Sequence, residues 1–208
     1  MVNIKDMHII LGSSSPRRKE LMEGLDLNIT VDTGNQVEET YNQTIPLHQI
    51  PKSLAIMKSK GFHRTLLKNE VLITADTMVF AMNNDSIEIP LGKPATYTEA
   101  KNMLNLLSGK SHQVITGVCL KYINENNIKI YRSFSDTAKV KFNLLSDSEI
   151  DYYLKKYKPY DKAGAYGIQE WIGYIGVKKI QGSYFNIMGL PVNKVYHELL
   201  KLETLLKK

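Results

Sequence analysis

Residues 8–20 read HIILGSSSPRRKE, and this stretch decides the fold at the start of the chain. The apolar run at 8–11 is typical of a short buried strand, and Gly12 of a tight exit from it. Ser15 followed by Pro16 is the usual pairing of an N-cap with a first helical residue. We therefore expect a strand, a serine-rich loop and a helix that begins at Pro16.

Arg17 and Arg18 then fall in the first turn of that helix. The unpaired N–H groups and the positive dipole end of a first turn favour acidic residues over cations. A bound anion would offset both charges, because backbone donors and two guanidinium groups would converge on it as in a phosphate cradle. The alternative is two solvated arginines on a surface turn, and this stretch alone does not separate the two.

Composition bounds the class of protein. The 208 residues suffice for one domain with a substantial core, and 43% apolar and 23% charged residues are typical of soluble globular proteins. No apolar run approaches the roughly 20 residues that span a bilayer, so we expect no membrane partner.

The N-terminus lacks a signal-peptide core and Cys119 is the single cysteine, which favours the cytoplasm. The net charge of +6 is distributed among acidic residues without a recognisable nucleic-acid module, so we expect no stable nucleic-acid partner.

Strand and helix patterns alternate without a linker or repeat, which favours a single α/β or α+β domain over 1–208. Apolar runs predict strands over 71–82, 113–123, 128–142 and 174–180. Periodicity predicts helices over 51–63 and after Pro191, the second with an apolar stripe at 195, 199, 202 and 206 that is typical of core. Capping boxes of Thr96 with Glu99 and of Ser146 with Glu149 predict helices between Thr96 and Gly109 and from Ser146 to about residue 156.

Asp76 interrupts the most apolar run, VLITADTMVF at 71–80. Burial of an ionised carboxylate costs several kcal/mol unless a cation or several donors compensate. A divalent metal would compensate, and the alternative is a structural aspartate bonded to nearby backbone and hydroxyl groups. Because the two arginines already imply a phosphate, we favour the functional interpretation.

Four other residues carry weaker signals. Glu39 lies on a polar segment and Lys58 on an amphipathic helix, which are normally solvent-exposed settings. Lys93 lies in a rigid Gly-Lys-Pro turn that can aim an ammonium group at an anion, although an exposed loop lysine is also reasonable. Gln169 closes the small-residue stretch DKAGAYGIQ at 161–169, where backbone can approach a ligand and an amide can pair with a base edge.

An ordered set of motifs resembles the Maf family of nucleoside triphosphate pyrophosphatases. The motifs are SSSPRRKEL at 13–21, ADT at 75–77, GKP at 92–94, LLSG at 106–109, TGV at 116–118, DKAGAYGIQ at 161–169 and GLP at 189–191. The resemblance runs from about Ile9 to Leu200. It implies an α/β fold similar to that of inosine triphosphate pyrophosphatases: two lobes on a long mixed β-sheet, with flanking helices and a central cleft.

The resemblance also implies hydrolysis of a nucleoside triphosphate substrate to the monophosphate and pyrophosphate, with Mg²⁺ or Mn²⁺ as cofactor. One branch of the family acts on dTTP, UTP and modified pyrimidine nucleotides, and another on 7-methyl-GTP. The first branch carries an arginine, a threonine after the catalytic aspartate, and a glutamine at positions that match Arg17, Thr77 and Gln169. This chain has all three, so the resemblance implies a preference for dTTP and UTP.

The catalytic aspartate of the family matches Asp76, and its other cleft residues match Arg18, Glu39, Lys58 and Lys93. Asp76 and Glu39 would hold the divalent ion, and Asp76 would orient or deprotonate the attacking water. The arginines and lysines would bind the substrate.

Glu170, which follows Gln169 where small residues are common in the family, leaves the base preference less certain. The rival hypotheses are a 7-methyl-GTP pyrophosphatase and a non-catalytic nucleotide-binding protein. A pure anion binder gains nothing from buried carboxylates, which argues against the second rival. A homodimer is left open.

Overall fold

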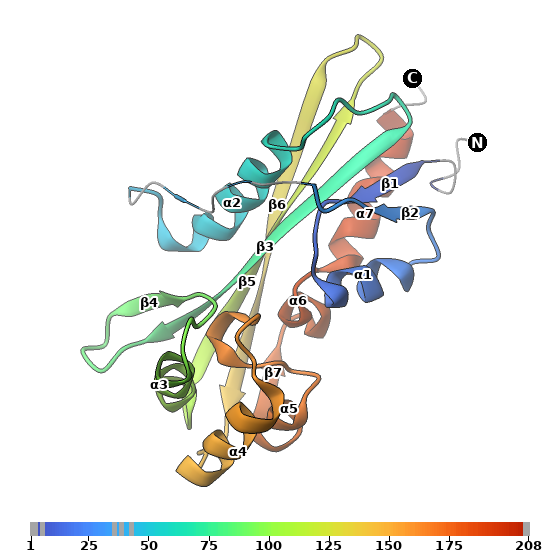
Figure 1. Ribbon diagram of the computed structural model, residues 1–208. Helices are drawn as coiled ribbons and strands as arrows, with labels where there is room; N and C mark the ends of the chain where they lie inside the picture. The colour runs from blue at the N-terminus through green and yellow to red at the C-terminus, as the bar shows by residue number, and fades with distance from the viewer. Residues whose placement is uncertain (1–3, 5–6, 35–36, 38–39, 42–43, 206–208) are drawn as a thin grey trace. The chain divides into compact units, whose positions relative to one another are not determined.

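A computed structural model describes residues 4, 7–34, 37, 40–41 and 44–205, and its elements can be followed in Figure 1. A seven-stranded sheet has the order β2-β1-β3-β5-β6-β7, with β4 paired to β3. The strands are β1 (His8–Leu11), β2 (Ile29–Val31), β3 (Glu70–Met82), β4 (Glu88–Leu91), β5 (Ser111–Ile123), β6 (Lys129–Phe142) and β7 (Val177–Gln181). β1 is parallel to β2 and β3, whereas β4 is antiparallel to β3 and β7 to β6. The expected α/β class with a mixed sheet is confirmed.

The helices largely follow the capping signals. They are α1 (Pro16–Glu23), α2 (Ile50–Lys60), α3 (Tyr97–Leu107), α4 (Asp147–Tyr157), α5 (Trp171–Gly176), α6 (Tyr184–Met188) and α7 (Val192–Leu205), with 3₁₀ turns η2 (Leu47–Gln49) and η3 (Ala163–Ala165). Ser146 and Glu149 form the predicted capping box of α4. At α3, Thr96 accepts from the amide of Glu99 as predicted, but the Glu99 carboxylate accepts from Ala95 instead.

The predicted strand over 174–180 is wrong in its first half, because residues 174–176 complete α5 and β7 begins only at Val177. A Cβ on Gly173 would lie 2.0 Å from the carbonyl oxygen of Ile168, so this helix packs on the preceding loop at a distance that only glycine permits. Such a short apolar helix has the same sequence pattern as a buried strand.

The chain divides into two compact units that are each assembled from separate segments. Unit 1 comprises Met1–Asp76, Thr116–Asp136 and Gly189–Lys208, and unit 2 comprises Thr77–Ile115 and Thr137–Met188. β3 leaves unit 1 at Asp76 and enters unit 2 at Thr77. These two consecutive residues, both predicted to be functional, therefore belong to different units.

Each unit has its own buried core. In unit 1, three sheet residues, Ile10, Leu72 and Ile123, pack with Phe62 and Leu66, which follow α2. The apolar stripe of α7 is buried as predicted at Val195, Leu199 and Leu202. In unit 2, the rings of His112, Phe142 and Tyr166 meet edge to face, with centroids 5.0–5.4 Å apart. Burial lowers the pKa of the His112 imidazole to about 4, so this histidine is neutral near pH 7.

No helix in the described ranges is long and apolar enough to cross a membrane.

Candidate active site

Asp76 is buried in β3, with 7% of its surface exposed, as the apolar residues around it predicted. Successive side chains alternate between the faces of a strand, so Asp76 shares a face with Thr74. The Thr74 hydroxyl donates to the carbonyl oxygen of Ala55 in α2 at 2.7 Å. This face of β3 is therefore covered by α2.

Lys58 comes from that helix, and its Nζ lies 2.6 Å from Oδ1 of Asp76. The two side chains are only 17% and 10% exposed. The lysine therefore points inward, whereas its place on an amphipathic helix favoured solvent exposure. The cation that a buried carboxylate requires is thus supplied by the chain itself.

Two contacts from β5 fix the backbone of α2 on either side of Lys58. A Cβ on Gly117 would lie 2.2 Å from the backbone nitrogen of Lys52, so only glycine fits where the helix approaches the strand. Lys121, 5% exposed, donates from Nζ to the carbonyl oxygen of Ser59 at 3.2 Å, and burial lowers its pKa. A buried lysine in an apolar strand was the signal for this contact, but the sequence did not identify its partner.

The helix N-terminus with the two arginines is formed as predicted, because the Ser15 side chain accepts from the amide of Arg18. The Arg18 side chain is also held within unit 1. Its Nε donates to the carbonyl oxygen of Gly189 at 2.9 Å and its Nη1 to Oγ of Ser13 at 3.3 Å. Arg18 therefore joins the loop before α1 to the turn between α6 and α7, which its sequence position did not indicate.

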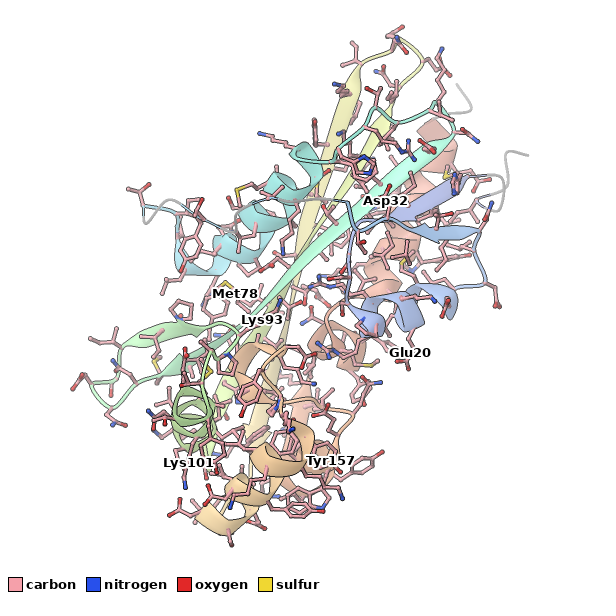
Figure 2. The ribbon with its side chains drawn as sticks, in the orientation of Figure 1. Glu20, Asp32, Met78, Lys93, Lys101 and Tyr157 are labelled. Atoms are coloured by element: carbon pink, nitrogen blue, oxygen red, sulfur yellow. The ribbon has the colours of Figure 1, made fainter. Side chains whose placement is uncertain are left out.

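In unit 2, the Lys93 and Gln169 loops are bonded to each other. Lys93 is exposed just after β4 (Figure 2), and the preceding Gly92 accepts from the amide of Gly164 at 3.0 Å. Gly164 has a φ of +68°, and a Cβ there would lie 2.9 Å from Cγ2 of Val79. The small-residue backbone thus closely approaches β3 and the Lys93 loop, whereas the expected approach to a ligand stays a prediction.

Thr77 lies on the side of β3 that faces this loop pair. It is half-buried and two residues before Val79, so the alternation of a strand places both on one face. Val79 is the residue that Gly164 approaches. By the same alternation the Thr77 side chain lies on the opposite face of β3 from that of Asp76.

The Glu170 carboxylate is bonded to two side chains of unit 2. Its Oε1 lies 2.9 Å from Nζ of Lys162, and its Oε2 accepts from the hydroxyl of Tyr153. The extra carboxylate beside Gln169 is therefore engaged within the protein. Tyr153 was not among the predicted site residues, since a tyrosine at a buried helix position has the pattern of an ordinary core residue.

Comparison with known proteins agrees with this arrangement of motifs. The sequence profile of the Maf-like protein family matches residues 8–202. The chain belongs to the Maf-like family.

Relatives of this Maf-like protein include a dTTP/UTP pyrophosphatase of Phocaeicola vulgatus, 50% identical over 96% of this chain and 98% of the relative. Proteins of the same name from Parabacteroides distasonis and Flavobacterium psychrophilum are 48% and 47% identical, covering 95% and 92% of this chain and 97% and 93% of the relatives. Among solved structures, the Ham1 protein of Staphylococcus aureus aligns with a TM-score of 0.42 at 13% identity, over 65% of this chain and 71% of that one. A dITP/XTP pyrophosphatase of Mycobacterium abscessus aligns with a TM-score of 0.40 at 12% identity, over 96% and 97%.

One of the two predicted metal ligands, Asp76, lies among the residues that the structure describes. Within the described ranges, no three His, Cys, Asp or Glu side chains gather into a metal-binding group. Asp76 provides one buried carboxylate, and Glu39, the other predicted ligand, lies outside the described residues. One or two carboxylates together with substrate phosphates are what Mg²⁺ sites commonly use, so the Asp76 carboxylate is a donor that fits such a site.

Proposed function

We propose that this Maf-like protein hydrolyses dTTP and UTP to the monophosphate and pyrophosphate. The observation that carries the proposal is the buried Asp76 carboxylate with Lys58 at 2.6 Å, a charged pair that a simple anion-binding protein does not need. The relatives called dTTP/UTP pyrophosphatase, which match almost the whole chain at close to half identity, support the substrate class.

Asp76 is the group that orients the attacking water and accepts its proton at a carboxylate oxygen. Geometry supports this role because the pair with Lys58 leaves Oδ2 outside the 2.6 Å contact. Lys58 stabilises the ionised carboxylate, and its ammonium group would also stabilise negative charge that develops on phosphate oxygens bound beside Asp76. Transfer of a phosphoryl-type group requires mainly positioning and charge stabilisation, so no serine or cysteine nucleophile is needed.

Arg17 and Arg18 are assigned to the phosphates at the N-terminus of α1, where no acidic side chain occupies the first turn. Lys93 adds a third cation on an exposed loop. The hydrogen bonds of Arg18 to Gly189 and Ser13 support this role, since they reduce the conformational freedom that binding would otherwise restrict.

A divalent cation, Mg²⁺ or Mn²⁺, is the cofactor that we assign to Asp76, with Glu39 as a second ligand. When bound, such an ion neutralises negative charge on the phosphate oxygens. Unit 1 lacks a larger described cluster of ligands, which supports an ion that binds together with the substrate rather than one that is permanently resident.

Gln169 and Thr77 are assigned to the base. Uracil and thymine present acceptor, donor and acceptor groups in a row, which one side-chain amide and backbone groups can match. Both residues belong to unit 2, and Gly164, in the same small-residue stretch as Gln169, approaches Val79 two residues after Thr77, which supports a shared role.

The test is pyrophosphate release from dTTP, UTP, CTP, GTP and 7-methyl-GTP with Mg²⁺, with Mn²⁺ and with a chelator. We expect the highest kcat/KM for dTTP and UTP and no turnover with the chelator. A preference for 7-methyl-GTP would contradict the proposal and support the 7-methyl-GTP branch of the family. Tight nucleotide binding without release of pyrophosphate would support the non-catalytic alternative and overturn the proposal.

We also propose a cytoplasmic location, which the free and buried Cys119 supports. Formation of a homodimer and the lack of a stable nucleic-acid partner stay predictions.

A further inference from the structure

A buried tyrosine is bonded to both ends of the turn that carries Gln169. The amide of Glu170 donates to the carbonyl oxygen of Gly167 at 3.0 Å, so residues 167–170 form a β-turn with Gln169 in a central position. The Tyr153 hydroxyl accepts from the amide of Gly167 at 3.0 Å and donates to Oε2 of Glu170. One phenol oxygen therefore holds the first and last residues of the turn.

The surroundings of Tyr153 leave little freedom for this contact. Tyr153 lies in α4, is fully buried, and stacks on Tyr157, which marks the end of α4 in Figure 2, with ring centroids 5.2 Å apart. Burial, reinforced by the bond to Glu170, raises the pKa of its hydroxyl, so it remains a donor at working pH. Both hydrogen-bonding functions of the hydroxyl are used by the turn.

Lys162 completes the arrangement. Its Nζ lies 2.9 Å from Oε1 of Glu170, with only 11% and 24% of the two side chains exposed. A Cβ on Gly167 would lie 2.7 Å from Cδ of Glu170, so the glycine makes room for the carboxylate. The charge of Glu170 is thus balanced inside unit 2 by that of Lys162.

We propose that Tyr153, Lys162, Gly167 and Glu170 form a clamp, and that Tyr153 and Glu170 are positioning residues that set base selectivity through Gln169. The selectivity rests on the proposed function, whereas the clamp itself is a property of the free protein. A recognition amide must be held in place if it is to reject the wrong base, because discrimination comes from buried polar groups that the wrong base leaves unpaired. Loss of the phenol oxygen frees the turn while leaving the Gln169 side chain chemically intact.

Tyr153→Phe is the main test variant and Tyr152→Phe its matched control. Tyr152 is the adjacent residue of α4, but its hydroxyl accepts from Lys156 at the surface. We expect Tyr153→Phe to lower the ratio of kcat/KM for UTP to that for GTP by about tenfold, mainly through KM for UTP, whereas Tyr152→Phe leaves the ratio unchanged. An unchanged ratio in Tyr153→Phe would overturn the proposal.

A double-mutant cycle with Gln169→Ala distinguishes positioning from a structural role. If the clamp acts through Gln169, adding Tyr153→Phe to Gln169→Ala leaves the UTP to GTP ratio where Gln169→Ala alone put it. A structural role predicts instead that Tyr153→Phe lowers kcat/KM for both nucleotides equally in either background, and that result would contradict the proposal. Glu170→Gln, which retains an oxygen acceptor but loses the charge facing Lys162, provides a second variant if Tyr153→Phe does not fold.

Hydrogen exchange tests the clamp without any substrate. We expect the Gly167 amide to exchange faster in nucleotide-free Tyr153→Phe than in wild type or Tyr152→Phe, because its acceptor has been removed. An unchanged rate would overturn the clamp whatever the substrate. If wild type shows no preference for UTP over GTP, the proposed function fails and the selectivity role fails with it, while the exchange result still decides whether the clamp holds the turn.

Discussion

The charged side chains around the candidate residues are paired differently in unit 1 and in unit 2. In unit 1 the Asp76 carboxylate is bonded directly to the Lys58 ammonium group. In unit 2 the charged neighbours of Gln169 are bonded away from it, Glu170 to Lys162 and to Tyr153. On the proposed function, we expect the chemistry of unit 1 to depend on the charge of Asp76 and Lys58, and base recognition in unit 2 to depend on the neutral amide of Gln169.

The two units also hold their residues by different means. Lys58 lies on a regular helix that is fixed by close packing on Gly117 and by the hydrogen bond from Thr74. Gln169 lies on irregular backbone, where Gly164 and Ala165 have φ values of +68° and +60°. Ala165 is costly in that conformation, so surrounding contacts must maintain it. Substitutions in unit 1 should therefore change turnover, and those in unit 2 should change selectivity.

The largest effect is expected at Asp76. Asp76→Asn keeps the shape of the side chain but removes its charge and basicity, so kcat should fall by about 10²–10⁴-fold for every nucleotide. Pyrophosphate release under saturating nucleotide measures this change. Asp85→Asn, in the exposed turn between β3 and β4, is the control and should behave as wild type. Wild-type turnover in Asp76→Asn would contradict the expectation that turnover depends on the charged pair of unit 1.

A smaller and selective effect is expected at Gln169. Gln169→Ala should lower kcat/KM for UTP by about 10–10²-fold and narrow its advantage over GTP, because the amide contact to the pyrimidine edge is lost. Gln181→Ala, at the exposed end of β7, is the matched control. Steady-state kinetics with both nucleotides test the prediction. An equal loss for UTP and GTP would show that unit 2 contributes to turnover in the same way as unit 1.

The pH dependence of stability should also separate the units. The His112 imidazole has a pKa of about 4 in the folded protein against about 6.5 when unfolded, so the unfolded state binds more protons between these values. This stabilisation of unit 2 is complete above pH 6.5 and decreases as the pH falls toward 4, with a loss of about 2 kcal/mol by pH 5. Urea unfolding of wild type and His112→Gln at pH 7.5 and pH 5 measures this loss. The free energy of unfolding should fall less between the two pH values in the variant than in wild type.

Unit 1 provides the contrasting case. The hydrogen bond from Arg64 holds the pKa of Glu70 below its usual value of 4.5, against the opposing effect of burial. The stabilisation from Glu70 is therefore present above pH 4.5 and is lost only as the pH falls through its folded pKa. Glu70→Gln should thus leave the change between pH 7.5 and 5 as in wild type. If it removed that change, His112 would not be its source.

Local signals in the sequence predicted much of the fold. Ser15 with Pro16, and Ser146 with Glu149, act within one helical turn, so their helix starts were correct. The strand β2 has three residues and α6 five, which is too short for periodicity to indicate either. The proposal that both units act as one domain stays a prediction.

Only those features of the site that depend on local sequence were predicted. Asp76 was found because an acidic residue in an apolar run is unusual wherever the strand packs. The inward direction of Lys58 depends on which strand its helix covers, and that is set by distant residues such as Gly117. The clamp joins Tyr153 to Glu170, 17 positions apart, and no local pattern specifies such a contact. Glu39 stays a prediction because it lies outside the described residues.

The smallest effects are expected from substitution of the two arginines of unit 1. Arg17→Ala removes a cation from the positive end of α1, so stability should be unchanged or rise by about 0.3–1 kcal/mol. Arg18→Ala gives the same relief but also removes its hydrogen bonds to Gly189 and Ser13, each of which contributes about 0.5–1.5 kcal/mol. Arg18→Ala should therefore be less stable than wild type, by about 1 kcal/mol. Both variants should bind a non-hydrolysable UTP analogue more weakly, because both lose a cation at the helix N-terminus. Urea unfolding without nucleotide, together with titration of the analogue, separates the two contributions. If both variants had wild-type affinity, the anion site at α1 would be wrong, and if Arg18→Ala had wild-type stability or more, the contact of Arg18 with Gly189 would not stabilise the fold.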